Sequence, residues 1–77
     1  MYKELVEYLI GYLVESKDEV SITEINDGDK LVLKLKVAPE DMGRVIGKDG
    51  RIIKSLREIL RAYSGRENKK VILQVEG

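Results

Sequence analysis

The sequence of 77 residues contains neither cysteine nor histidine. Without thiols the chain has no disulfide and no thiolate zinc site, and without imidazoles it has no Ser-His or Cys-His nucleophile pair and no histidine base. The turn carboxylates Asp27 and Asp29 offer fewer oxygen ligands than a metal ion needs. We therefore expect a protein that is not an enzyme and that holds no metal and no cofactor.

Long hydrophobic runs are also missing. No apolar stretch reaches the length of about 18 residues that a membrane span needs, and no basic segment followed by an apolar one opens the chain. A chain this short has room for one hydrophobic core, because it buries only about 60% of the surface that its unfolded form exposes. We expect a single domain over residues 1–77 in a soluble, cytoplasmic protein.

The chain has no net charge, but its charges are unevenly placed. Residues 1–29 carry eight acidic and two basic side chains, whereas residues 44–70 carry nine basic and three acidic ones. This segregation indicates one basic surface in the second half of the chain. Part of it also fits the solvated side of an amphipathic helix, where cations recur at Arg51, Lys54, Arg57 and Arg61.

The spacing of apolar residues predicts an α-β-β-α-α-β order. Helical spacing predicts three helices, over residues 2–16, from Pro39 to about Ile46, and from Arg51 to a stop at Gly65. Alternation predicts three strands, over residues 19–25, 30–37 and 69–75, the first two joined by a tight turn. A helical crossover should make the last two strands parallel. The expected fold class is α+β, with a three-stranded mixed sheet, helices on one face, and Lys34 and Lys36 on the open face.

The apolar faces of the helices define the expected core. The first helix contributes Tyr2, Leu5, Val6, Leu9, Tyr12 and Leu13, and the last contributes Ile52, Ile53, Leu56, Ile59, Leu60 and Tyr63. Ile10 and Val14 lie on the flank of the first stripe. They are either a second contact surface or scattered exposed apolar residues of no consequence.

The stretch VIGKDGRIIKSL, residues 45–56, places Gly47 and Gly50 between two helical segments. A chain that turns from one helix into another within four residues needs φ angles that glycine adopts at little cost. The missing side chains also let a phosphodiester approach the free N–H groups at the start of the next helix. Asp49 either repels such an anion or caps the helix, which would stabilise it by about 1 kcal/mol; we favour the cap. The spacing does not match a nucleotide-hydrolysing phosphate loop.

This stretch, with Gly43-Arg44 ahead of it, resembles the V-I-G-x-x-G-x-x-I-x-x-L signature of the KH domain. The order of elements resembles the type II, bacterial arrangement of that fold, and the resemblance covers essentially the whole chain. It implies an RNA-binding protein whose G-x-x-G loop grips the backbone of about four single-stranded nucleotides. It further implies a role as an RNA chaperone or regulator.

The resemblance also implies which residues contact RNA. The clamp would be the turn from Gly47 to Gly50, and the apolar floor would combine Val45, Ile46 and Ile53 with Ile72 or Leu73. The far wall would be the loop before the last strand. The full expected set is Gly43, Arg44, Val45, Ile46, Gly47, Lys48, Asp49, Gly50, Arg51, Ile53, Lys54, Arg66, Lys69 and Lys70.

Two expectations about partners follow. The first partner is single-stranded RNA, held with modest affinity because the site region has no aromatic residue other than Tyr63, which belongs to the core face. The second is another copy of the chain or another KH-containing protein, docked through Ile10 and Val14 of the first helix. A KH fold that kept only protein contacts, as an interaction adaptor with weak or no RNA binding, is the alternative function.

Overall fold

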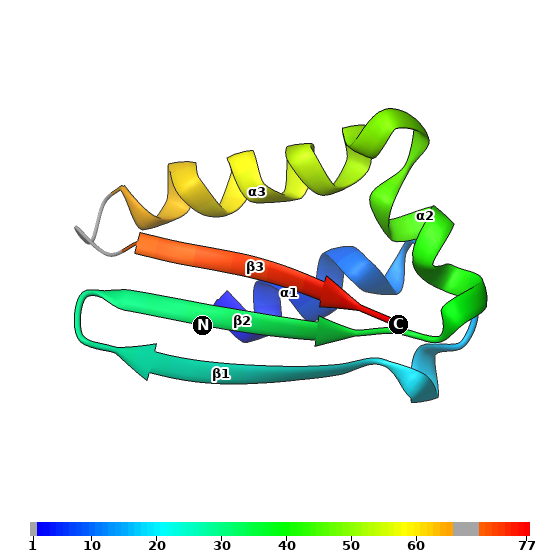
Figure 1. Cartoon of the computed structure of the whole chain (residues 1–77), viewed down its shortest axis with the longest axis horizontal. Helices are drawn as coiled ribbons and strands as arrows, with labels where there is room; N and C mark the ends of the chain where they lie inside the picture. Colours follow the sequence, from blue (N-terminus) through cyan, green and yellow to red (C-terminus); the bar gives the residue numbers. More distant parts are fainter. Residues whose placement is uncertain (1, 66–69) are drawn as a thin grey trace.

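The computed structural model describes residues 2–65 and 70–77 as three α-helices and a three-stranded sheet (Figure 1). The helices are α1 (Tyr2–Gly11), α2 (Met42–Ile46) and α3 (Arg51–Ser64), and the strands are β1 (Ser21–Asp27), β2 (Lys30–Lys36) and β3 (Lys70–Glu76). Short 3-10 turns occupy Lys17–Glu19, Pro39–Asp41 and Lys48–Gly50. The predicted α-β-β-α-α-β order is confirmed, with strand boundaries that differ by one or two residues.

The sheet has the order β1-β2-β3. β1 and β2 form an antiparallel hairpin whose two-residue turn contains Gly28 at φ 62°, a conformation that suits glycine. β2 and β3 are parallel, as the crossover through α2 and α3 predicts. β3 is therefore an edge strand, and Figure 1 shows α3 running alongside it.

The predicted alternation of β2 is confirmed. Leu31, Leu33 and Leu35 are buried against the helices, whereas Lys34 and Lys36 are exposed on the opposite face of the sheet. The helices thus cover one face and leave the other to solvent. None of the helices in the described part of the chain is long and apolar enough to cross a membrane.

The first helix differs from its prediction in both length and orientation. α1 ends at Gly11 rather than near residue 16, because glycine is a poor helix former and because the following segment turns toward α2. Its buried residues are Tyr2, Val6 and Ile10, and Val14 beyond the helix is buried as well. Tyr12, which the pattern placed in the core, is 74% exposed. The predicted contact surface at Ile10 and Val14 is therefore wrong, since both side chains pack inside the domain.

The last helix buries most of its predicted face. Ile53, Leu56 and Leu60 are in the core, and Tyr63 packs edge-on against the ring of Tyr2. Ile59 is 43% exposed and does not belong to the core face. The helix ends at Gly65 as expected, but with φ −58° rather than in a left-handed cap.

Candidate nucleic-acid interface

The turn between α2 and α3 has an unusual backbone. Gly47 has φ 77° and ψ 174°, a conformation open to glycine almost alone, and Gly50 has φ 73°. Between them Asp49 also has a positive φ of 56°. We call residues 47–50 the glycine turn. Three of its four residues have a positive φ, which accounts for the sharp change of direction between the two helices.

Packing adds a second reason for Gly47. A Cβ built at this position would lie 2.6 Å from Cγ1 of Ile52, closer than real side-chain carbons approach. A Cβ at Gly50 would make an ordinary contact at 3.8 Å with Ile53. Gly47 is therefore required by backbone and by packing, whereas Gly50 is required by its left-handed φ alone.

The predicted helix cap at Asp49 is wrong. The residue that precedes α3 is Gly50, and among the described residues no side chain accepts a hydrogen bond from the first turn of this helix. Asp49 is exposed, and its left-handed backbone is one that aspartate tolerates better than most residues. Its carboxylate consequently stays on the surface of the turn.

The start of α3 lies among several charged side chains. The N–H groups of Gly50 and Arg51 donate to the carbonyls of Gly47 and Lys48, and the first turn of the helix carries the positive end of the helix dipole. Lys48 and Arg51 are exposed on either side of this point, and Lys54 is exposed one turn further on. The positive end of the dipole thus lies close in sequence to three exposed cations and one exposed carboxylate, Asp49, and the excess of positive charge suits an anion.

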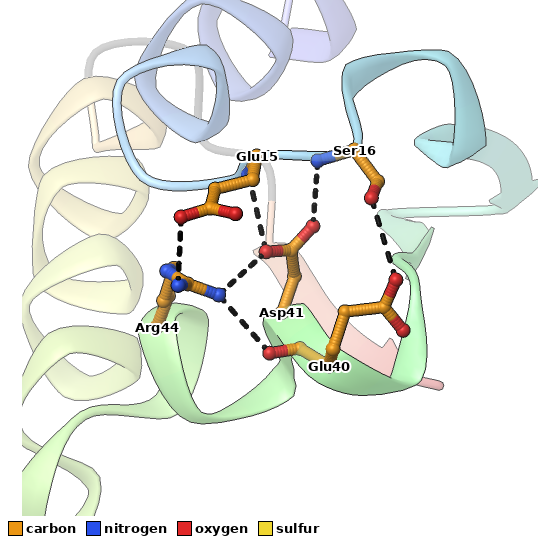
Figure 2. A network of polar contacts seen from close by, with 5 residues as sticks. All are labelled: Glu15, Ser16, Glu40, Asp41 and Arg44. Atoms are coloured by element: carbon orange, nitrogen blue, oxygen red, sulfur yellow. Dashed lines mark hydrogen bonds and ion pairs between the residues drawn. The ribbon is translucent and has the colours of Figure 1, made fainter.

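Arg44, another residue predicted to contact RNA, binds acceptors of its own chain instead. Figure 2 shows its guanidinium between the α1–β1 connection and the start of α2. It donates to Oε1 of Glu15 at 2.9 Å, to Oδ1 of Asp41 at 3.0 Å and to the carbonyl of Glu40 at 3.2 Å. The Arg44 side chain is still 44% exposed, but its orientation is set by these three acceptors rather than by the glycine turn.

Asp41 is the centre of this network and was not predicted as such. Its side chain is fully buried, and its two oxygens accept the backbone N–H groups of Glu15 at 3.1 Å and Ser16 at 3.0 Å (Figure 2). These two hydrogen bonds, helped by the nearby Arg44 cation, lower the pKa of the Asp41 carboxyl despite its burial. We call Glu15, Ser16, Glu40, Asp41 and Arg44 the Asp41 network. It fastens the end of the α1 region to α2.

The predicted apolar floor lies mostly inside the core. Val45 is fully buried, and Ile53 and Leu73 are 7% and 2% exposed. Val45 in particular offers no surface to a ligand. Ile46 and Ile72 are half-buried and keep some exposed surface, and Gly43 is exposed on α2.

A groove of about 440 Å³ lies between α3 and β3. Its lining comes from Arg57, Glu58, Arg61, Ser64 and Gly65 on one side and from residues 70–73 on the other. Lys70 is thus in the groove as predicted for the far wall, whereas Arg66 and Lys69 lie outside the described residues. Arg57 was not predicted as a contact. Its Nε and Nη2 donate to the carbonyl of Leu73 in β3, at 3.3 and 3.2 Å, and helical spacing does not reveal this neighbour.

Comparison with known proteins identifies the family. The sequence model of the family described as "KhpA/KhpB, KH domain" matches residues 3–75. The chain belongs to this KH-domain family. A protein named "RNA-binding protein KhpA" from Clostridium acetobutylicum is 45% identical over 73 residues, which cover 95% of this chain and 97% of the relative. Proteins of the same name from Aquifex aeolicus and Chlamydia trachomatis are 42% and 37% identical, covering 95% of this chain and 92% and 94% of their own lengths. No solved structure gave a significant match.

The KH family match confirms the resemblance that the glycine turn indicated. It runs from α1 to β3, so the KH fold accounts for every element of the sheet and for all three α-helices. The glycine turn, the groove and the Asp41 network all lie within the matched residues. In this KH domain the turn lies at the start of α3 (Figure 1). The groove lies beside β3.

Proposed function

We propose that this KH domain binds single-stranded RNA and holds the RNA backbone at the glycine turn. The observation that carries the proposal is the start of α3, where the positive end of the helix dipole meets the exposed cations Lys48 and Arg51. A phosphodiester oxygen is a negatively charged hydrogen-bond acceptor, and it therefore complements the positive charge of this site. The relatives named as RNA-binding proteins support the same assignment.

The bound strand would continue from the turn into the groove between α3 and β3. Lys54 and Arg57 are three residues apart and share one side of α3, so they form a basic track in that direction, whereas Arg61 is paired with Glu58 at 2.6 Å. No aromatic side chain lines the groove in the described residues, since Tyr63 packs against Tyr2. Bases are then held by edge hydrogen bonds and apolar contacts, and the affinity is modest.

The proposed activity is binding rather than catalysis. Contacts to the RNA backbone give little sequence specificity, because every nucleotide carries the same phosphate. Such a grip suits an RNA chaperone or regulator that acts on many transcripts. The competing function, a protein-interaction adaptor without useful RNA affinity, draws on the exposed Asp49 carboxylate in the turn and on the zero net charge of the chain.

Replacing Lys48 by aspartate tests the grip. The side chain is exposed, so Lys48→Asp should leave the melting temperature nearly unchanged while weakening the binding of a ten-nucleotide uridine RNA by about tenfold at low salt. Lys34→Asp makes the same charge change on the open face of the sheet and serves as the matched control. Its RNA affinity should stay within about twofold of wild type, apart from a small long-range effect that salt screens.

Fluorescence anisotropy at two salt concentrations gives the readout. A protein that neutralises phosphates releases counterions, so the wild-type affinity should fall steeply as the salt concentration rises. The slope of log affinity against log salt concentration should be shallower by about one for Lys48→Asp. Equal losses in the two variants would remove the glycine turn as the contact point. An absence of any binding at low salt would favour the adaptor.

A further inference from the structure

β1 forms the second edge of the sheet, opposite β3 (Figure 1). Just beyond β2 the N–H of Val37 bonds to the carbonyl of Glu76 in β3, so the odd-numbered positions of β2 direct their backbone groups toward β3. The even-numbered positions direct theirs toward β1, where they meet its odd-numbered residues. The backbone groups of the even-numbered residues Ile22 and Glu24 therefore point away from the sheet.

The outward-facing backbone at the middle of β1 is unpaired. Among residues 2–65 and 70–77 neither the N–H nor the carbonyl of Glu24 forms a hydrogen bond, and Glu24 is exposed to solvent. An edge strand with free N–H and C=O groups is a template on which a further strand can form. β3 has α3 beside it, and Arg57 already occupies the carbonyl of Leu73. Of the two edges, β1 is the one open to another chain.

The open edge is acidic. Five exposed carboxylates and no basic residue lie between residues 18 and 29. None of the five forms an ion pair with another described residue. Glu24, at the middle of β1, lies opposite Leu33, so no lysine of β2 faces it across the strand pair. A strand that docks here is favoured when it brings positive charge. The five carboxylates are Asp18, Glu19, Glu24, Asp27 and Asp29.

The same charges disfavour a second copy of β1 as the docked strand. Two copies paired antiparallel over the whole of Ser21–Asp27 would place Glu24 directly opposite Glu24. Like charges in that position destabilise a strand pair, and charged side chains protect many edge strands from pairing with themselves. A basic strand meets no such repulsion.

An apolar row on the open face of the sheet ends at this edge. Ile25, Val32 and Ile72 lie side by side on the three strands. Val32 and Ile72 are half-buried, whereas Ile25, the last of the row, is 40% exposed. An aliphatic side chain opposite Ile25 in a docked strand would continue the row and cover this residue.

A small groove continues the edge beyond the start of β1. It has a volume of about 230 Å³ and lies between α1 and the residues that precede β1. Gly11 has no side chain to fill it, and a Cβ built at this position would have no neighbour within 4 Å. The groove therefore has room for an apolar side chain of a docked strand. Its lining is Glu7, Ile10, Gly11, Val14, Lys17 and Val20.

From these features we propose that β1 docks an extended basic segment of a partner protein as a fourth strand of the sheet. The segment runs antiparallel to β1 and exchanges backbone hydrogen bonds with Ile22 and Glu24. It carries lysine or arginine opposite Glu24 and Asp27, an aliphatic residue opposite Ile25, and another in the groove beside α1. Because β1 and β3 are opposite edges of the sheet, such a partner leaves the groove between α3 and β3 free.

A synthetic octapeptide, Lys-Thr-Val-Lys-Thr-Val-Lys-Leu, tests the docking. With its first lysine opposite Asp27, its second lysine faces Glu24, its first valine faces Ile25 and its leucine reaches the groove. Titration with this peptide should shift the backbone amide NMR signals of Ile22 and Glu24 and slow the exchange of both amides with deuterium. The same peptide with every lysine replaced by glutamate should have neither effect.

Two N-methylated peptides separate strand pairing from charge attraction. A methyl group on the backbone nitrogen of the second lysine removes the donor to the Glu24 carbonyl and should weaken binding about tenfold. A methyl group on the nitrogen of the first valine, whose N–H points away from β1, keeps every hydrogen bond and should change the affinity by less than about twofold. Equal affinities of these two peptides would show that charge alone attracts the segment and would overturn its docking as a strand.

Charge reversal in the protein completes the test. Glu24→Lys should weaken the octapeptide about tenfold and should bind the glutamate peptide better than wild type does. Glu76→Lys makes the same exchange at an exposed residue of the opposite edge, so its affinity for the octapeptide should stay within about twofold of wild type. If the octapeptide shifts no amide signal of β1 at millimolar concentration, the docking is refuted and the carboxylates serve only to prevent self-pairing. Equal losses in Glu24→Lys and Glu76→Lys would refute β1 as the docking edge.

Discussion

The Asp41 network and the glycine turn lie a few residues apart and contain the same kinds of side chain, an aspartate and a basic residue. In the network, the carboxylate of Asp41 and the guanidinium of Arg44 bond to each other and to four further groups of the chain. In the turn, neither Asp49 nor Lys48 makes a side-chain hydrogen bond or ion pair with a described residue. The same chemistry holds the domain together at one place and remains exposed to solvent at the other.

The difference shows that charge counts do not locate a binding surface. Arg44 and Lys48 contribute equally to the excess of positive charge in the second half of the chain. Only the acceptors around Arg44 show that its charge serves stability. Cations without a carboxylate partner are the ones available to a polyanion, and Lys48 and Arg57 meet that condition within the described residues.

The largest expected effect on stability comes from Gly47→Ala in the turn. The substitution combines a φ of 77° with a Cβ 2.6 Å from the Ile52 side chain, and should cost about 2 to 4 kcal/mol of unfolding free energy. Urea denaturation followed by circular dichroism measures it. Gly43→Ala is the control, because Gly43 is helical, has no neighbour within 4 Å of its Cβ, and should be neutral or slightly stabilised. Equal midpoints for the two variants would contradict the strain assigned to the turn.

The next effect concerns the network and its dependence on pH. Asp41→Asn should lower the unfolding midpoint at pH 6, because an amide nitrogen would face groups that all donate hydrogen bonds. The pKa of Asp41 is lowered in the folded state, so the carboxylate contributes stability above its unfolded pKa of about 3.9, and this contribution is lost as the pH falls through the lower folded pKa.

Denaturation of wild type and Asp41→Asn between pH 3 and pH 6 tests the direction of this pH dependence. The difference in unfolding free energy between wild type and Asp41→Asn should be largest at pH 6 and should shrink below about pH 4. The other carboxylates titrate in both proteins, so their contribution cancels when the unfolding free energy of the variant is subtracted from that of wild type. A difference that stays constant, or grows as the pH falls, would contradict the role assigned to the Asp41 carboxylate.

The sequence allowed the glycine turn and the strand alternation to be predicted because both depend on local properties. Gly47 and Gly50 indicate a backbone conformation that few other residues adopt, and the leucines of β2 recur at every second position, as the alternation of a strand requires. The rotation of α1 was missed because Ile10 and its neighbours form two adjacent apolar rows. Periodicity does not say which row meets the sheet.

The Asp41 network and the Arg57 contact were missed for a different reason. Asp41 binds backbone groups 25 and 26 residues away, and Arg57 binds a carbonyl 16 residues away. Each contact exists only once the fold has brought the two segments together. Asp41 in the sequence looks like an ordinary acidic residue at a helix start, and Arg57 looks like one of four cations on a solvated face.

The smallest predicted effect is also the one that compares the two regions most directly. Asp49 differs from Asp41 in having no hydrogen-bond donor among residues 2–65 and 70–77, so removing its charge should leave stability intact while helping an anion to approach. Asparagine tolerates a left-handed backbone at least as well as aspartate, which makes Asp49→Asn a change of charge with little strain. The affinity for uridine RNA should rise about two- to fivefold at low salt and return toward wild type at high salt, where the repulsion is screened. Asp18→Asn, at an exposed aspartate in the first half of the chain, should change neither stability nor RNA affinity. If Asp49→Asn binds RNA no better than wild type at low salt, the phosphate does not pass the glycine turn closely enough to meet this carboxylate.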